Sequence, residues 1–320
     1  MWFWSSSRRA MIELLLILAA ILSFVFGWNN SSFLIGNLSG SGLLTVRDSI
    51  LLSVCGLLVG VLLEGSKMVK SLSGALAPTP SALGLEVTFA ATILVTVALT
   101  VAALPASVSA AMVGAFLGVA VSSALRVNAG QAYFVISFWF VAPLLTFFVA
   151  LGLHRFLSRI VSNFSLLAVD SFNRVGVIAT SLAVAYTLGA NNVGLIYGTA
   201  LGGLGSANAL LVAVGLTLFA MVGAALLGKR NVSGTLGDKM LALTPQGVLA
   251  AFFSSALLVW VGTQLAVPMS ISYCLLGGML GSAYSTRLTV VNRRLASESI
   301  ATWIVTPVAA FAIAYVALLL

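Results

Sequence analysis

The sequence of 320 residues contains very few charged side chains. Asp, Glu, Lys and Arg together make up 7% of the residues, whereas hydrophobic residues make up 61%. A water-soluble domain carries roughly 25% charged residues, which cover its surface. This shortage excludes a soluble enzyme or binding domain. It predicts an all-α polytopic protein that is embedded in a lipid bilayer.

Histidine and cysteine are almost absent as well. Cys55 and Cys274 lie in apolar stretches, so the sequence predicts neither a disulfide framework nor a thiolate metal site. The single histidine, His154, lies in a polar segment, which argues against a zinc centre and against a histidine-activated nucleophile. We therefore predict that the protein is not an enzyme and that it binds no metal or other cofactor.

The excess of basic residues, a net charge of +8, does not point to a nucleic-acid partner. These residues occur in twos and threes between apolar stretches, which is typical of loops at a membrane surface. Four of the acidic residues are predicted to lie at helix boundaries or in loops: Glu13, Glu64, Asp238 and Glu298.

Apolar segments that are long enough to form helices recur along the whole chain. A full crossing takes about 20 residues, and several segments are shorter or are interrupted by Gly, Pro or Asn. The segment 193–227 exceeds one crossing and predicts a half-helix followed by a whole helix. The predicted helical segments are 10–28, 43–63, 83–103, 104–125, 131–153, 174–190, 193–227, 244–264, 268–285 and 299–320.

An internal repeat organises these segments. The sequence GWNN at 27–30 returns as GANN at 189–192, and PASVS at 105–109 returns as PMSIS at 268–272. A GxxxG pattern follows each copy of the second motif, and we expect it to allow close helix packing. The repeat predicts two transmembrane halves, 10–153 and 174–320, with a central linker at 154–173.

The number of segments predicts that the two halves have opposite orientations. Each half contains five helical segments, or three crossings if two of its segments form a re-entrant hairpin. Both numbers are odd, so the second half enters the membrane inverted. Inverted repeats with broken helices are typical of secondary transporters, whose substrate site lies near the bilayer midplane.

Paired asparagines mark the first repeated motif. An Asn pair that begins two positions after a helix-breaking Gly, in both halves, predicts an unwound helix that lines a cavity. Freed carbonyl groups and amide side chains there would bind a cation or an oxyanion. The alternative is that these side chains only hydrogen-bond neighbouring helices.

Serines mark the second repeated motif. Pro-x-Ser-x-Ser at the start of an apolar segment predicts a helix N-terminus, with the Pro in the first turn. The serine hydroxyls and the unpaired backbone N–H groups of such an end bind anions, helped by the helix dipole. Two such ends, brought together by inversion, would form a cradle for an oxyanion. The alternative is a capped helix whose serines bond back to their own backbone.

These motifs resemble the inorganic phosphate transporter family, the PiT-type cation-coupled symporters. That family carries a G-A-N-D-V-A-N-A and a P-V-S-T-T-H signature in each half. Further matches are GSGLLT at 40–45, TLGDKM at 235–240 and WIVTP at 303–307. The resemblance implies inverted repeats with re-entrant hairpins and cation-coupled phosphate uptake.

The resemblance also implies the residues of the site. Asn29, Asn191, Ser107, Ser109, Ser270 and Ser272 are expected to bind the substrate, and Asn30 and Asn192 the coupling cation, Na⁺ or H⁺. Asn30 and Asn192 stand where the family has Asp, whereas Ala110 and Tyr273 stand where it has His. Without the two carboxylates, Na⁺ is expected to bind more weakly.

The sequence therefore predicts a transporter that imports inorganic phosphate by cation symport. The alternative is a permease for sulfate or another tetrahedral oxyanion on the same scaffold. An intramembrane enzyme would need His154 or paired acids beside Ser107 or Ser270, and a passive channel would need a continuous pore. We expect a multi-pass protein of the plasma membrane, and its Leu-rich exterior would accept a homodimer.

Overall fold

The computed structural model describes residues 2–40, 44–102, 104, 106–204, 208–227, 243–286 and 293–320. Three of the sequence matches lie partly or wholly outside the described residues: positions 41–43 of GSGLLT, the whole of TLGDKM at 235–240, and Pro105 of the serine motif. In the first half the elements are α1 (Trp2–Ser31), the π-helical η1 (Ser32–Gly36), α2 (Asn37–Gly40), α3 (Val46–Glu64), the 3₁₀ turn η2 (Gly65–Met68), α4 (Ala82–Val101), α5 (Val108–Ser122) and α6 (Ala129–Val161).

The second half repeats this order. Its elements are α7 (Leu166–Thr187), the π-helical η3 (Leu188–Val193), α8 (Gly194–Leu204), α9 (Ala209–Leu227), α11 (Pro245–Gln264), α12 (Ile271–Ser285) and α13 (Arg293–Ala317). Eight helical segments of the described chain are long and apolar enough to cross a membrane. The predicted all-α, multi-pass architecture is confirmed, as is the half-helix and whole helix within 193–227.

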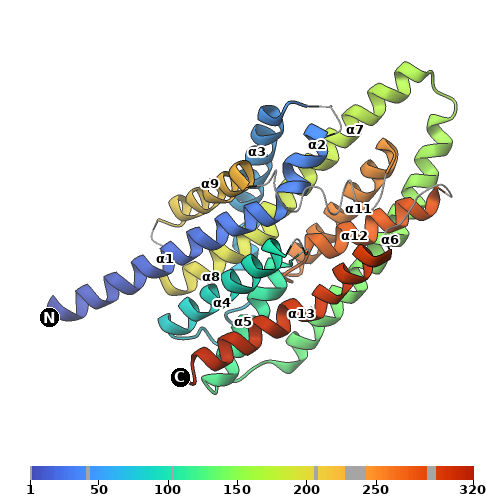
Figure 1. Cartoon of the computed structure of the whole chain (residues 1–320). Coiled ribbons are helices and arrows are strands. Elements are labelled where there is room, and N and C mark those ends of the chain that lie inside the picture. Colours follow the sequence, from blue (N-terminus) through green and yellow to red (C-terminus); the bar gives the residue numbers. More distant parts are fainter. Residues whose placement is uncertain are drawn as a thin grey trace.

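Two helical hairpins, α4–α5 and α11–α12, enter the molecule from opposite ends (Figure 1). The first comes from the end that carries both termini, and the second from the end where α6 meets α7. Their tips meet in the interior, where the Ser109 hydroxyl donates to the Met269 carbonyl oxygen at 2.8 Å. This arrangement is the one expected of inverted repeats with re-entrant hairpins.

Close contacts between helices relate the two halves position by position. Gly27 of α1 packs on the backbone of Ala220 in α9, and Gly189 of η3 packs on the backbone of Leu57 in α3. The two glycines are 162 positions apart and their partners 163. Each half therefore packs its first helix on the second helix of the other half, so the repeats are intertwined.

The GxxxG motifs obey the same relation. Gly114 and Gly118 of α5 contact the backbone of α13, and Gly277 and Gly281 of α12 contact the backbone of α6. The partners are equivalent too: Pro307 and Phe311 in one case, Pro143 and Phe147 in the other. The prediction that these glycines allow close helix packing is confirmed.

Replacing Gly281 by alanine is expected to destabilise the protein by about 1–3 kcal/mol, because the added methyl group would overlap the Phe147 backbone. Gly152→Ala is the matched control, since a Cβ there meets no atom within 4 Å. Thermal unfolding of the purified protein in detergent measures the difference. Equal melting temperatures for the two variants would contradict the close contact of α12 with α6.

The predicted central linker is helical rather than an extended loop. Residues 154–161 complete α6, α7 begins at Leu166, and only 162–165 form the turn. His154 is buried, and its Nδ1 lies 3.0 Å from the carbonyl oxygen of Ser282 in α12. The linker therefore packs against the second hairpin, and a boundary between repeats at 154–173 stays a prediction.

Candidate functional site

The asparagine pairs lie where the first helix of each half changes its winding. Asn191 and Asn192 belong to the π-helical η3, and Asn29 and Asn30 lie in α1 just before the π-helical η1. The predicted unwinding is wrong: the helix widens to a π-helix but is not broken. π-Helical turns occur frequently at functional sites because they re-aim side chains.

The first asparagine of each pair contacts an equivalent threonine. Asn29 Nδ2 donates to Thr100 Oγ1 at 2.8 Å, and Asn191 Nδ2 donates to Thr263 Oγ1 at 3.0 Å. Sequence reasoning missed both threonines. A signal was present, because each lies five residues before the Pro of the serine motif.

The amide of Asn191 holds the tip of the second hairpin. Its Nδ2 also donates to the Val267 carbonyl oxygen at 3.0 Å, and its Oδ1 accepts from the Met269 N–H at 2.8 Å. The side chain is fully buried. Asn191 thereby fixes the chain just before α12, and its predicted contact with substrate stays a prediction.

Ser107 and Ser270 cap the helices that begin at the two tips. Ser107 Oγ accepts from the Ala110 N–H at 3.2 Å, and Ser270 Oγ accepts from the Tyr273 N–H at 3.4 Å. The predicted helix starts are confirmed, but Pro268 lies two residues before the cap and not in the first turn. A capping hydroxyl keeps its own hydrogen for a ligand, and the N–H groups of the first turn lack intrahelical acceptors.

Residues of both halves meet between these helix starts. Asn192 Nδ2 donates to Ser109 Oγ and, at 3.2 Å, to the Met269 carbonyl oxygen, to which Ser109 also donates. Asn192 Oδ1 is buried and accepts no hydrogen bond from the described residues. The structure thus brings Ser109 and Asn192 together and leaves one buried acceptor for a ligand.

Two predicted residues are less closely connected. Asn30 Nδ2 donates to the Phe26 carbonyl oxygen of its own helix at 3.0 Å and to Asn29 Oδ1 at 3.4 Å. Ser272 lies in the first turn of α12. Within the described ranges no hydrogen bond joins either to Ser109 and Asn192. All eight predicted site residues are buried, with at most 7% of any one exposed, so the site is closed to solvent.

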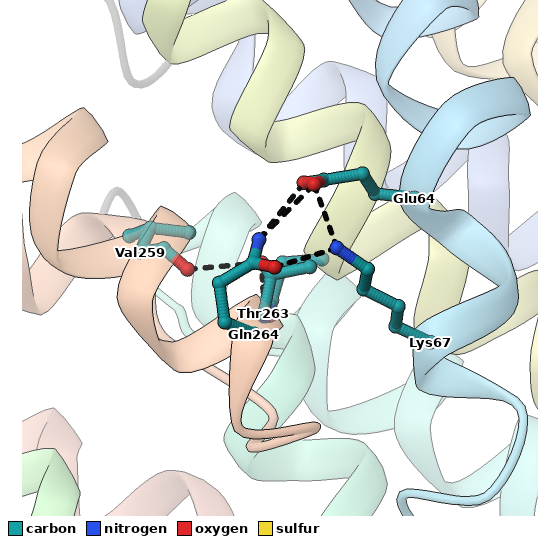
Figure 2. Close-up of polar contacts among 6 residues, drawn as sticks. Glu64, Lys67, Val259, Thr263 and Gln264 are labelled. Carbon is teal, nitrogen blue, oxygen red and sulfur yellow. Dashed lines mark hydrogen bonds and ion pairs between the residues drawn. The ribbon is translucent and has the colours of Figure 1, made fainter.

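A charged cluster lies beside the second tip (Figure 2). Lys67 Nζ lies 2.7 Å from Glu64 Oε1 and 2.6 Å from Gln264 Oε1. Gln264 Nε2 donates to both Glu64 oxygens, at 3.1 and 3.2 Å. We call these three residues the clasp. It joins the end of α3 in the first half to the end of α11 in the second, one residue from Thr263.

His154 does not lie at the hairpin tips. It contacts Ser282, twelve residues after Ser270, which corresponds to about 18 Å along α12. No group of three His, Cys, Asp or Glu side chains that could hold a metal ion occurs among the residues described. The local chemistry is therefore that of hydroxyls, amides and helix ends.

Known proteins resemble this chain over nearly its whole length. The model of the phosphate transporter family matches residues 26–314. A Methanocaldococcus jannaschii protein, provisionally named as a phosphate permease, is 25% identical over 308 residues, 95% of this chain and 96% of that protein. The chloroplastic inorganic phosphate transporter 2-1 of Arabidopsis thaliana is 29% identical over 159 residues, 48% of this chain and 24% of that protein.

A solved structure has the same fold. It is named a sodium-dependent phosphate transporter and superimposes with a TM-score of 0.81, covering 97% of this chain and 100% of that one. The sequences are 19% identical. At this identity the likeness shows the fold, and it confirms the architecture predicted from the repeats.

Proposed function

Because this chain belongs to the phosphate transporter family, we propose that it imports inorganic phosphate across its membrane by cation symport. The family consists of transporters, so the prediction that the protein is not an enzyme is confirmed. We propose the plasma membrane as its location, and the homodimer stays a prediction.

The observation that carries the proposal is the meeting of two helix N-termini inside the protein. α5 and α12 begin at Ser107 and Ser270, and their tips are joined through Ser109 and the Met269 carbonyl. Each helix start carries about half a positive charge and exposes backbone N–H groups. Together with the serine hydroxyls these groups suit a tetrahedral oxyanion and need no Lys or Arg.

The unpaired acceptor, Asn192 Oδ1, can be satisfied in two ways. It can accept a proton from phosphate, which would favour phosphate over sulfate, or it can bind the coupling cation. Phosphate carries a proton near neutral pH and can donate it to Asn192 Oδ1, whereas sulfate can only accept. A buried polar group without a partner is penalised by about 1–3 kcal/mol, so the site binds best a substrate or a cation that satisfies this oxygen.

Sulfate is the second candidate, because one observation favours it. Asn30 and Asn192 stand where the family has Asp, so neither position carries a negative charge to repel a dianion. The helix ends and hydroxyls serve any tetrahedral oxyanion equally.

Uptake of labelled phosphate and labelled sulfate into proteoliposomes tests the proposal, with and without a Na⁺ or H⁺ gradient. We expect accumulation of phosphate that depends on one of the gradients. Sulfate uptake with phosphate excluded would favour the second candidate. Phosphate flux that never exceeds equilibrium under any gradient would indicate a channel and contradict symport.

A further inference from the structure

Tyr273 lies at the start of α12, three residues after the Ser270 cap. Its side chain is 2% exposed, and its ring stacks on Trp303 of α13 with the centroids 4.6 Å apart and the planes at 27°. Its backbone N–H is held by Ser270 Oγ. The position of the phenol is therefore fixed by packing before any ligand binds.

The Tyr273 hydroxyl is buried among groups of the candidate site without being satisfied by them. It lies beside the Ser107 side chain, at the start of the opposing helix α5. It nevertheless makes no hydrogen bond of ordinary geometry with the described residues. A buried tyrosine hydroxyl usually finds a partner, and leaving it unpaired costs about 1–3 kcal/mol.

The first half has no equivalent of this hydroxyl. Ala110, 163 positions earlier, stands at the corresponding place in α5 and is fully buried. The two helix starts are therefore unequal: both offer serine hydroxyls, but only α12 adds a phenol. This asymmetry indicates that the Tyr273 hydroxyl serves to contact a bound ligand and is not needed for the helix packing that the two repeats share.

We propose that Tyr273 is a substrate-binding residue whose hydroxyl donates a hydrogen bond to one oxygen of the transported oxyanion. This inference rests on the proposed function, since it places the anion between the starts of α5 and α12. The phenol lies next to Ser107, so one anion oxygen can contact both hydroxyls. A donor fixed by ring stacking loses little side-chain entropy on binding, which strengthens the contact.

Tyr273→Phe tests this role, because it removes the hydroxyl and retains the ring on Trp303. Binding of inorganic phosphate to the purified protein is measured from the phosphate-dependent rise in melting temperature. We expect the affinity to fall at least about tenfold, the loss typical of a hydrogen bond to a charged ligand. The melting temperature without phosphate is expected to stay equal or to rise. Tyr284→Phe, on the exposed end of α12, is the matched control.

Three outcomes would overturn the inference. Unchanged phosphate affinity in Tyr273→Phe, with binding by the wild type, overturns the role of Tyr273 and leaves the proposed function in place. A lower melting temperature without phosphate would assign the hydroxyl a structural role. Absence of phosphate binding by the wild type would overturn the proposed function, and this inference with it.

The clasp carries a second, independent inference. The sequence does not repeat its residues: 163 positions away, the counterparts of Glu64 and Gln264 are Leu227 and Val101. The counterpart of Lys67, Arg230, lies outside the described residues. A contact that only stabilises the shared fold would be expected in both halves. In a transporter the site opens to one side of the membrane at a time, so we infer that the clasp controls the opening to one side only.

The clasp also acts on the site directly. Gln264 follows Thr263, the residue that accepts from Asn191, so the clasp and the second tip share one short segment. Lys67 and Glu64 lie three residues apart in the first half, so only the hydrogen bonds of Gln264 join the two halves. These hydrogen bonds lie at an exposed position, so water can replace each of them when the clasp opens. We infer that the clasp is a latch: it holds the second tip against the end of α3, and it opens when the site opens to the side of the membrane on which the clasp lies.

Reversible bridging of the latch tests this inference. Glu64→Cys and Gln264→Cys are combined in a Cys55→Ser background and joined with a short bis-methanethiosulfonate. We expect uptake to stop on bridging and to return on reduction, while each single-cysteine variant keeps its uptake. Undiminished uptake by the bridged protein would overturn the latch. Loss of uptake in the unbridged double variant would also overturn it, because a latch is dispensable when open.

Discussion

Replacing Ser107 or Ser270 by alanine is expected to reduce phosphate uptake at least about tenfold, and the double replacement to abolish it. Each hydroxyl caps its own helix and retains a hydrogen that can be donated to the anion. A hydrogen bond to a charged partner contributes about 1.5–3 kcal/mol, which corresponds to a loss of roughly 10- to 150-fold. Initial rates of labelled phosphate uptake in proteoliposomes measure the loss.

The loss of a cap must be separated from the loss of a ligand. Replacing a capping serine by alanine lowers the stability of a protein by about 0.5–2 kcal/mol, whether or not the serine binds a ligand. Ser81 is the matched control, since it caps α4 of the first hairpin and accepts from the Gly84 N–H at 3.2 Å, away from the tip. Ser81→Ala should lower the melting temperature as much as Ser107→Ala while uptake persists. Wild-type uptake by Ser107→Ala or Ser270→Ala would contradict the cradle.

Repetition made much of this site predictable from sequence. The serine and asparagine motifs are local and duplicated, so the helix starts follow from their residues. The inverted relation follows from the odd number of helical segments in each half. The same reasoning could have found Thr100 and Thr263, whose equal distance from the repeated Pro was present in the sequence. Contacts that obey the pseudo-twofold relation are accessible in this way because each half confirms the other.

Features that break the repeat were not predictable. Glu64 was expected to be a boundary charge, and it does end α3, but its partner Gln264 lies 200 positions away and has no duplicate. The π-helical turns were not predicted either, because the local sequence does not distinguish them from α-helix. His154 was placed in a polar linker because of its neighbours, whereas its own side chain packs on α12.

Replacing Asn192 by aspartate is expected to make uptake strictly dependent on Na⁺. The amide nitrogen, which donates to Ser109 Oγ and the Met269 carbonyl oxygen, would become a carboxylate oxygen facing the same two atoms. The Ser109 hydroxyl could turn to donate to this carboxylate, but the Met269 carbonyl oxygen would repel it in a buried site unless a cation lies between them. An all-oxygen ligand set with one negative charge is what hard cations prefer.

The variant therefore separates a sodium site from a substrate site. We expect Na⁺ to raise the melting temperature of Asn192→Asp more than that of the wild type, and uptake without Na⁺ to fall at least about tenfold. Asn30→Asp is the comparison: Asn30 donates to the Phe26 carbonyl of its own helix and to Asn29, so a cation there would have to displace a local contact. A sodium response unchanged in both variants would mean that neither side chain contacts the ion. A response confined to Asn192→Asp would place coupling at the junction of the two hairpin tips, where the ion and the anion would neutralise each other as both cross.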